Sequence, residues 1–499
     1  MTETERAYRR PTAAAAALAG DAADPYRFLD KRVAVTGDSF VLTPNGRACL
    51  SYATRLVVKI CRNVSISLPG SAAEQVEVAR SLATKVAIGQ PISVDASVPD
   101  PAEFDAILSL SHRPFQHHRS TTINSNGWLG RIGNSPQLLD GPVDQYNPVG
   151  ALAAASIGCS EVFKRLISLK PERGRPIEAL TFSAFSYSCG GTDPGPPLPS
   201  NIPIDLGLVG LGAIGNATAT LLADLPVSGR VLAIDHDFFE EVNLATCLSI
   251  GMSDLGSSKA EFARALLSGR LDVIPFTETV QKVSERFGPT LPFPPVFANG
   301  LDDIESRVFV QGLWPDLVVD GAMGGQALAQ VSVHPWGPDV GCLKCTLREP
   351  FGEPSDVVQV RATGLRRERV AEADSLVTSQ DVAEAPEGRK EWLRDRVGRA
   401  VCSVIEEGVA DELSQHRQRA EFRPAVPFVA TMSAAMVVAE VVRMVMGFPS
   451  PLEPRYQLDL FQGPERGQLV PQSRKIDCEC TARRPNIERF RNLRAEGQR

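Results

Sequence analysis

The first half of the chain alternates the patterns of strands and helices. Short apolar runs at residues 32–36 and 64–68 predict two buried β-strands. Between them, apolar residues recur at helical spacing over residues 46–59 and predict an α-helix. A strand, a helix and a second strand in this order are typical of a βαβ unit with parallel strands.

The same order returns later in the chain. Residues 205–209 and 230–234 have the apolar composition of buried strands, and residues 214–225 between them have helical periodicity. The repeat predicts an α/β protein with two tandem Rossmann-like folds that pack as an internal pseudo-dimer. Any two α/β domains share this alternation, so unrelated domains are the alternative.

Proline and glycine mark the clearest boundary, at residues 190–199, because neither a helix nor a strand continues through such a sequence. The polar, Ala-rich residues at the start predict a poorly ordered arm. The predicted organisation is an arm at 1–24, a first domain at 25–189, a linker at 190–202, a second domain at 203–480 with an insert at 346–423, and a tail at 481–499.

Residues 428–446 are the most apolar stretch of the chain, interrupted by Glu440 and Arg443 and ended by glycine and proline. This pattern predicts a core helix. Because no run of 18 or more apolar residues occurs, we expect no membrane-spanning helix and no membrane partner. A further helix is predicted at residues 391–405, within the insert.

The composition restricts the class of protein. Apolar residues make up 43% of the chain and charged residues 22%, which is typical of a folded globular protein. The formal net charge of -7 argues against nucleic acid as a partner, since nucleic-acid affinity is built from basic surface. The N-terminus does not resemble a signal peptide, and ten cysteines are too few for a disulfide scaffold. We therefore expect a cytoplasmic protein.

A glycine-rich turn lies between the first strand and the helix of the second unit. Gly210, Gly212 and Gly215 occupy the places where backbone amides approach a phosphate at the positive end of a helix. Asp235 follows about 20 residues after Gly215, where a carboxylate accepts hydrogen bonds from ribose hydroxyls. Together they predict an adenine nucleotide, either ATP or NAD. The corresponding loop of the first unit, residues 37–40, lacks closely spaced glycines, so its nucleotide site is predicted to be lost.

Further residues decide between ATP and NAD. The glycine turn is followed by Asp235, Asn243 and Lys259, and then by the segment 298–307. In order and spacing this series resembles the ubiquitin-activating enzyme superfamily, with its ThiF/MoeB-type adenylyltransferases of thiamine and molybdopterin synthesis. The resemblance implies ATP as the nucleotide. It also implies that Asp235 binds the ribose, that Asn243 and Lys259 contact the phosphates, and that Asp302 binds Mg²⁺.

Lys259 and Asp302 are the residue types that this chemistry requires. Attack of a carboxylate on the α-phosphate brings negative groups together, so a lysine and a divalent ion must neutralise the charge that grows on the leaving pyrophosphate. We therefore predict a catalytic role for Lys259. The ordinary alternative for any lysine is a solvated position on a helix.

The sequence departs from the superfamily pattern at one point. Where the family has Arg-Gln after Asn-Leu, this chain has Thr246 and Cys247. Threonine replaces neither the charge nor the bidentate geometry of an arginine, so another arginine must compensate or activity is weakened. Arg9, Arg10 and Arg264 are the candidates.

Four of the ten cysteines form two close pairs. They are Cys342 with Cys345 and Cys478 with Cys480. Four thiolates complete a tetrahedral Zn²⁺ site, and because no ligand position stays open for water, the zinc would be structural. The second pair is C-x-C rather than the more usual C-x-x-C, and incidental pairing is the alternative.

Cys402 is the only cysteine between the two pairs and lies in the insert. Its segment resembles the superfamily crossover in which a cysteine followed by Gly-Val attacks the acyl-adenylate and forms a thioester. The alternative is a buried cysteine on an apolar helix face.

These features lead to one main hypothesis. The resemblance implies an enzyme that uses ATP to adenylate the C-terminus of a ubiquitin-like protein, forms a thioester on Cys402, and transfers the acyl group to a conjugating enzyme. It also fits bacterial ubiquitin-like conjugation operons, including those implicated in antiphage defence. A sulfur-carrier-protein adenylyltransferase is the rival enzyme. A non-catalytic scaffold that binds a nucleotide or a ubiquitin-like protein is the alternative that Thr246 favours.

Overall fold

The computed structural model contains two compact units, residues 1–346 with 424–499 and residues 347–423. The larger unit contains two mixed α/β sheets, and the smaller is helical. The described residues are 3–18, 26–90, 92–133, 145–287, 293–324, 327–337, 340–347, 355–372, 375–401, 404–405, 407–408, 425–451, 454–471, 473–476 and 478–497.

The first sheet has seven strands in the order β3-β2-β1-β4-β5-β6-β7. The pairs from β3 to β5 are parallel, whereas β6 and β7 are antiparallel additions. Strong β-formers such as Val33, Val35 and Ile107 occupy its buried positions. The strands are β1 (Arg32–Gly37), β2 (Asn63–Ser67), β3 (Ser93–Asp95), β4 (Ala106–Leu110), β5 (Ser120–Asn126), β6 (Leu129–Gly133) and β7 (Ala179–Ser183).

The second sheet repeats this topology with one strand added. Its order is β10-β9-β8-β11-β12-β13-β14-β15, parallel from β10 to β12 and antiparallel afterwards. The strands are β8 (Ile202–Val209), β9 (Val227–Ile234), β10 (Asp272–Phe276), β11 (Val296–Asn299), β12 (Leu317–Gly324), β13 (Leu328–Pro335), β14 (Pro454–Asp459) and β15 (Gln468–Pro471). The repeated strand order confirms the prediction of two tandem Rossmann-like folds.

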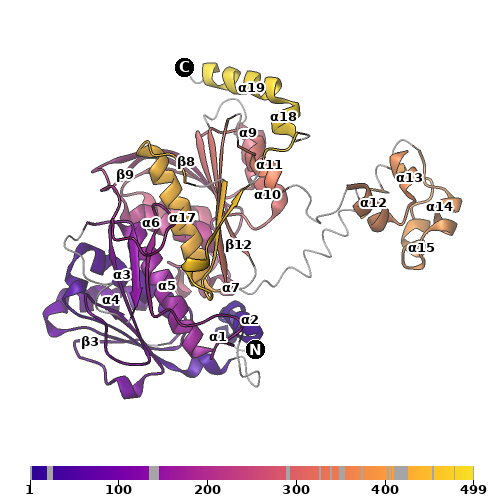
Figure 1. The fold of residues 1–499 in the computed structure, drawn as a ribbon. Helices are drawn as coiled ribbons and strands as arrows, with labels where there is room; N and C mark the ends of the chain where they lie inside the picture. The colour runs from indigo at the N-terminus through magenta and orange to yellow at the C-terminus, as the bar shows by residue number, and fades with distance from the viewer. Residues whose placement is uncertain are drawn as a thin grey trace. The chain divides into compact units, whose positions relative to one another are not determined.

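Four helices join the two halves of the larger unit. They are α3 (Pro44–Val57), α5 (Pro148–Leu166), α6 (Ala213–Asp224) and α17 (Pro427–Val445). α5 packs on the first sheet, α17 packs on the second, and the two helices contact each other (Figure 1). By length and composition alone α17 could cross a membrane, but 89% of its most apolar window is buried inside the protein. The predicted core helix is thus confirmed.

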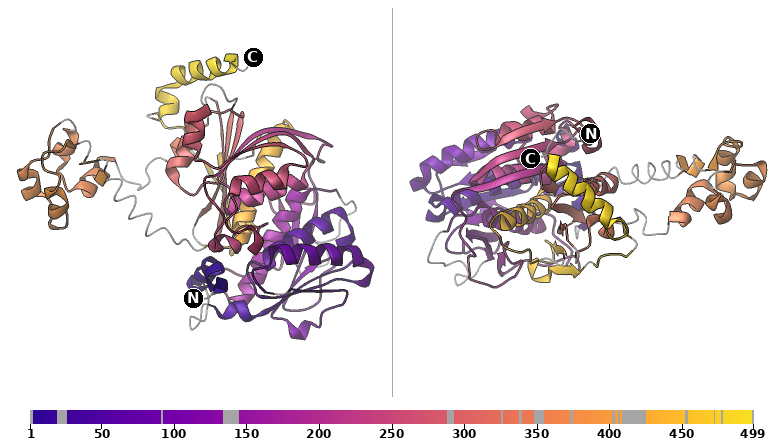
Figure 2. Two further views of the ribbon diagram at one scale, coloured as in Figure 1. Left: turned by 180° about the vertical axis from the view of Figure 1, so that it is seen from behind. Right: turned by 90° about the horizontal axis from the view of Figure 1, so that it is seen from above.

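Apart from the N-terminal residues 3–18, the larger unit has further helical elements before, between and after the strands of its two sheets (Figure 2). In the first half they are η1 (Arg27–Asp30), η2 (Ser39–Leu42), η3 (Gly70–Ala72), α4 (Ala73–Val86) and η4 (Pro101–Glu103). In the second half they are α7 (Glu241–Leu244), η6 (Met252–Asp254), α8 (Lys259–Leu267), α9 (Val280–Phe287), α10 (Ile304–Gly312), α11 (Leu343–Thr346), η7 (Pro464–Arg466), α18 (Glu479–Ala482) and α19 (Arg484–Gly497).

The N-terminal residues differ from the poorly ordered arm that the sequence predicted. Residues 3–18 form two helices, α1 (Glu3–Ala7) and α2 (Arg9–Leu18). Alanine has the highest intrinsic helix propensity, so the Ala-rich run favours α2. Tyr8 anchors the pair, since its side chain is fully buried and its hydroxyl donates a hydrogen bond of 2.8 Å to the carbonyl of Val58.

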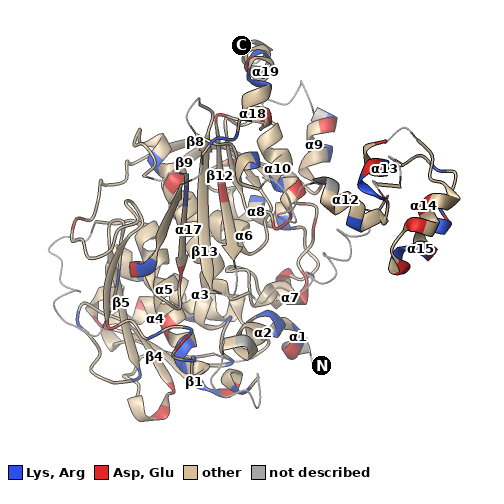
Figure 3. Ribbon diagram, turned by 45° about the vertical axis from the view of Figure 1, so that its right-hand side comes forward, with Lys and Arg blue, Asp and Glu red and all other residues tan. Residues whose placement is uncertain are grey.

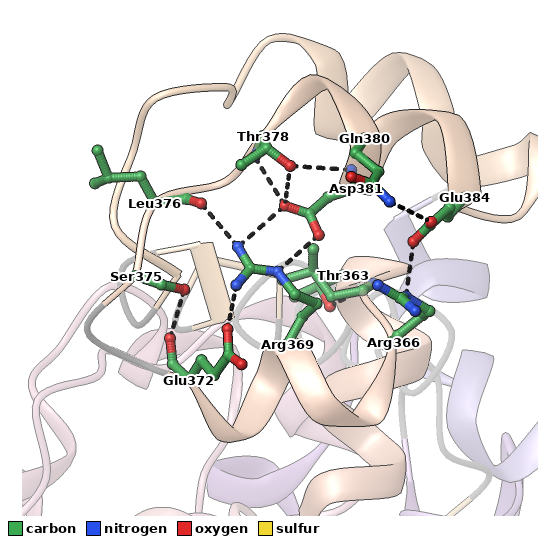
Figure 4. A network of polar contacts seen from close by, with 11 residues as sticks. Thr363, Arg366, Arg369, Glu372, Ser375, Leu376, Thr378, Gln380, Asp381 and Glu384 are labelled. Carbon is green, nitrogen blue, oxygen red and sulfur yellow. Dashed lines mark hydrogen bonds and ion pairs between the residues drawn. The ribbon is translucent and has the colours of Figure 1, made fainter.

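The smaller unit folds around a core of its own. Its described helices are α12 (Ser355–Thr363), α13 (Arg367–Ala371), α14 (Ser379–Glu384) and α15 (Glu387–Arg394). Arg369 lies at the centre of a polar network and donates to Asp381 at 2.8 Å (Figure 4). Acidic and basic residues are interspersed along α13 to α15 (Figure 3).

The helix predicted at residues 391–405 is wrong in extent. α15 ends at Arg394, and the chain then turns through Gly398, whose φ of 86° is in the left-handed region. The backbone amide of Gly398 donates to Val377 and that of Val401 to Ser375. These two contacts within the unit compete with helical hydrogen bonds, so tertiary structure ends the helix.

Candidate nucleotide and metal sites

The glycine turn connects the end of β8 to the start of α6. Gly210 has a φ of 78°, and a Cβ there would lie 2.7 Å from the amide nitrogen of Leu301. A Cβ on Gly215 would lie 2.0 Å from the carbonyl oxygen of Gly210. At Gly212, by contrast, no described atom lies within 4 Å of the Cβ position. The turn therefore brings bare backbone to the positive end of α6, where an anion is stabilised.

Asp235 directly follows β9 beside this turn, and the residue is 8% exposed. It accepts hydrogen bonds from the amides of Leu211 at 2.5 Å and Asp237 at 2.9 Å. Burial raises the pKa of Asp235, while the charge of Lys259 and the two amides act in the opposite direction. The carboxylate thus fixes the glycine turn and keeps further lone pairs for a ribose hydroxyl.

Lys259 is the first residue of α8 and is 7% exposed. Its Nζ donates to Oδ2 of Asp237 at 2.7 Å. Burial by itself lowers the pKa of Lys259, but Asp235 and Asp237 outweigh it and hold the pKa above the ordinary lysine value. The lysine is therefore charged and fixed beside Asp235, which suits an electrostatic role.

Asn243 and Thr246 belong to the short segment that follows β9. Oδ1 of Asn243 accepts the amide of Glu240 at 2.9 Å and so caps α7. Thr246 is 1% exposed, and its hydroxyl donates to the carbonyl of Asn243 at 3.2 Å. The Thr246 side chain thus turns back onto the end of α7. It brings no positive charge to the place where the family has an arginine.

The three candidate replacements for that arginine have different surroundings. Arg264 lies on α8 and forms an ion pair with Glu261 at 2.6 Å. Arg9 lines a cavity of about 430 Å³ next to α7. Arg10, on α2, lies within electrostatic range of the thiol of Cys247; burial raises the pKa of this thiol, and the charges of Lys259, Lys59 and then Arg10 lower it. Of the three, Arg10 has a charge interaction with the residue next to Thr246.

The loop between β11 and α10 provides acidic and amide groups at the same edge of the sheet. Asp302 is exposed. Asn299 is 1% exposed, and its Nδ2 has no hydrogen-bond acceptor among the described residues. β11 pairs with β8 so that Asn299 lies opposite Val209, just before the glycine turn. A buried donor without a partner beside a bare backbone loop fits a site for a polar ligand.

The corresponding loop of the first half is filled by protein. Phe40 and Val41 of η2 are buried, and a Cβ on Gly37 would lie 2.5 Å from Cγ1 of Val41. Asp38 accepts the amide of Phe40 at 2.8 Å. The side chain of Val41 thus occupies the space beside Gly37, in agreement with a degenerate first copy.

The structure brings the four predicted metal ligands together. Cys342, Cys345, Cys478 and Cys480 are all buried, and their sulfur atoms lie within 4.8 Å of one another. The separations are 3.9 Å for Cys342–Cys345, 3.7 Å for Cys342–Cys478 and 3.6 Å for Cys345–Cys480. Four sulfur atoms at about 2.3 Å from a zinc in tetrahedral geometry lie about 3.8 Å apart. The cluster therefore fits Zn²⁺, including its C-x-C pair.

Cys402 lies outside the described residues. Its neighbours Val401 and Val404 are buried in the core of the smaller unit, with Leu393. Its role as acyl acceptor stays a prediction.

The sequence did not single out two acidic partners in the site. Asp237 holds Lys259. Asp320, within β12 and opposite Asn299 at the end of β11, forms an ion pair with Arg307, whose Nε lies 2.9 Å from Oδ1. Burial lowers the pKa of Arg307, but Asp320 outweighs burial and raises it. The position of Asp237 just after a strand could have pointed to the site, because ligands of open α/β sheets bind outside the carboxyl ends of the strands.

Comparison with known proteins agrees with this geometry. Residues 204–480, more than half of the chain, match the ThiF family. The chain belongs to the ThiF family. The match lies in the half that has the glycine turn, Lys259 and the cysteine cluster, and it confirms the predicted superfamily.

Two relatives and one group of crystal structures resemble this ThiF-family chain. The uncharacterized protein y4jF of Sinorhizobium fredii (strain NBRC 101917 / NGR234) is 25% identical over 84% of this chain and 83% of its own. The bacterial E1-like protein BilD of Collimonas sp. (strain OK412) is 27% identical over a matched segment that covers 42% of this chain and 47% of BilD. The crystal structure of E. coli MccB with ATP is 14% identical, with a TM-score of 0.37, and the match covers 72% of this chain and 97% of MccB.

Proposed function

We propose that this ThiF-family protein uses ATP to adenylate the C-terminal carboxylate of a ubiquitin-like protein. A carboxylate oxygen attacks the α-phosphorus of ATP, the bond from that phosphorus to the bridging oxygen breaks, and pyrophosphate leaves. The observation that carries the proposal is the pairing of Lys259 with Asp237 beside Asp235 and the glycine turn. The family match and the E1-like relative BilD support it.

The main groups of the site have the following tasks in the proposed reaction. The bare backbone at Gly212 and the start of α6 bind the phosphates, and Asp235 binds the ribose. Lys259 stabilises the charge that develops on the leaving pyrophosphate. Asp302 would hold Mg²⁺, which supplies further charge neutralisation when bound. Zn²⁺ at the cysteine cluster has a structural role.

The thiol of Cys402 is proposed to accept the acyl group. After loss of the thiol proton to solvent, the thiolate attacks the carbonyl carbon of the acyl-adenylate, the bond from that carbon to the AMP oxygen breaks, and AMP leaves. The resulting thioester can pass to a conjugating enzyme. This step separates the proposal from the sulfur-carrier alternative, whose product would be a thiocarboxylate.

A Cys402→Ala variant tests this step. With ATP and the cognate ubiquitin-like protein, we expect wild-type rates of ATP–pyrophosphate exchange, because adenylation precedes transfer, but no thiol-sensitive adduct on a non-reducing gel. Cys189→Ala is the matched control and should keep both signals. Persistence of the adduct in Cys402→Ala would contradict the assignment. No exchange by the wild-type protein would instead support the scaffold alternative that Thr246 favours.

Arg10 is proposed to supply the positive charge that Thr246 lacks. We expect Arg10→Ala to raise the KM for ATP by about 10- to 100-fold, since a hydrogen bond to a charged group contributes about 1.5–3 kcal/mol. Arg10→Lys should recover part of this loss, because it keeps the charge without the bidentate geometry. The measurement is pyrophosphate exchange at varied ATP.

Arg264→Ala is the control for this experiment, since its guanidinium is already paired with Glu261 on the same helix. It should keep the wild-type KM. If Arg264→Ala raises the KM and Arg10→Ala does not, the assignment is reversed.

A further inference from the structure

Helix α3 of the first half directs three polar side chains at the second half. Tyr52 and Arg55 lie on one face of the helix, and Lys59 continues that face just beyond its end. We call these three residues the α3 polar face. Tyr52 and Lys59 are fully buried, and Arg55 is half-buried. Buried polar groups are retained where their partners fix a geometry.

Helix α6, which starts at the glycine turn, presents a matching row. Asn216, Thr220 and Asp224 recur every four residues and so lie on one face. The hydroxyl of Tyr52 donates directly to Oδ2 of Asp224 at 2.6 Å. The two faces are thus joined at the C-terminal end of α6.

Ser249 joins the two faces nearer the glycine turn at the start of α6. Its Oγ accepts a hydrogen bond from Nη1 of Arg55 at 2.8 Å. The same Oγ forms a hydrogen bond with the hydroxyl of Thr220 at 2.6 Å. Its backbone amide donates to Oδ1 of Asn216 at 3.0 Å. Because Asn216 lies in the first turn of α6, this chain of contacts leads from the first half to the phosphate-facing end of the helix.

Lys59 holds the backbone of Ile250, the residue after Ser249. Its Nζ donates to the carbonyl of Ile250 at 2.6 Å and to that of Val86, the last residue of α4, at 3.0 Å. The negative end of the α4 dipole favours an ammonium there. Burial lowers the pKa of Lys59 to about 7, an effect that Cys247 and Asp254 oppose.

The backbones of the two halves are also in close contact at this point. A Cβ on Gly251 would lie 1.8 Å from the carbonyl oxygen of Lys85. The segment 249–251 therefore has little freedom to shift relative to α3 and α4.

We propose that the α3 polar face is a positioning element that sets the affinity of the second half for ATP. It holds α6 and Ser249 in place, so that the backbone amides of the glycine turn meet the phosphates without reorganisation. The inference rests on the proposed function in that ATP is the ligand. It assigns the degenerate half a task in nucleotide binding although Val41 packs against Gly37 in its own loop.

The test compares two arginines of α3. Arg55→Met removes the donor to Ser249 while keeping much of the apolar stem. Arg47→Met is the matched control, since Arg47 is exposed and donates to the carbonyl of Leu42 next to its own helix. The full chain is titrated with MgATP by calorimetry, well below the unfolding midpoint of each variant. We expect about a tenfold higher Kd for Arg55→Met, no change for Arg47→Met, and partial recovery in Arg55→Lys.

A double-mutant cycle with Ser249→Ala completes the experiment. If Arg55 acts through Ser249, the double variant should raise the Kd about as much as either single variant, rather than by their product. Wild-type Kd values in both single variants, with only lower unfolding midpoints, would show a purely structural interface and overturn the inference. Independent, multiplicative effects would also overturn it. If the wild-type protein binds no ATP, the proposed function itself fails, which is a separate outcome.

Discussion

Replacing Lys259 with methionine is expected to lower ATP–pyrophosphate exchange by about 10²–10³-fold, the range found when one preorganised donor is removed from a developing negative charge. The side chain is buried and held by Asp237 at 2.7 Å, so no other lysine can readily take its place. Methionine keeps the apolar stem and removes the charge. The effect should therefore appear in the rate of exchange more than in the unfolding midpoint.

Two further variants make this prediction specific. Lys282→Met removes an exposed lysine from α9 and should leave exchange unchanged. Asp237→Asn keeps Lys259 but weakens its anchor, so its loss should be smaller than that of Lys259→Met. If Lys259→Met retains full exchange, the phosphate chemistry does not take place beside Asp235 and the proposed site is wrong.

Loss of zinc is expected to have the second large effect. Structural zinc contributes about 10–16 kcal/mol in small zinc-binding peptides, which is comparable to the whole stability of a typical domain. Here the cysteine cluster joins α11 to α18 and packs against Trp314 and Ile487. The ion pair of Lys344 with Glu479, at 2.5 Å, links the same two segments. A zinc ion held by this cluster would connect α18 to the segment that follows the second sheet's β13.

We expect one equivalent of zinc per chain by metal analysis. A strong chelator, or the variant Cys345→Ser, should remove it and lower the free energy of unfolding by several kcal/mol. Cys189→Ser is the control, because Cys189 lies outside the cluster, and it should keep the metal and the stability. A metal-free protein with an unchanged unfolding midpoint would contradict a structural zinc site.

Local patterns were enough to predict the main elements of the site. Apolar runs and helical periodicity predicted β1, α3, α6 and α17, because each buries a whole face and so must follow the period of its element. The glycine turn was visible because only glycine tolerates the close backbone contacts at Gly210 and Gly215. The four cysteines were visible because zinc ligands come in close pairs.

Contacts between distant segments were beyond such patterns. The sequence could name Arg9, Arg10 and Arg264 as substitutes for the missing arginine, but which of them lies near Cys247 depends on how α2 packs. The helices at residues 3–18 could not be predicted without the contact of Tyr8 with Val58, which lies 50 residues further along the chain. The end of α15 at Arg394 could not be predicted either, because it depends on the distant carbonyls of Val377 and Ser375, which accept hydrogen bonds from the backbone amides after the helix.

The sequence by itself therefore determined the two Rossmann-like halves, the half that contains the glycine turn, and the four clustered cysteines, since each follows from local spacing and burial. Only the tertiary structure decided that Asp237 holds Lys259, that the four sulfur atoms lie at tetrahedral separations, and that α3 reaches Ser249. The physical reason is that hydrogen bonds and ion pairs act over a few ångströms. Which groups come that close is decided by the packing of segments that are distant in the sequence, within the second half and between the halves, and no local pattern encodes it.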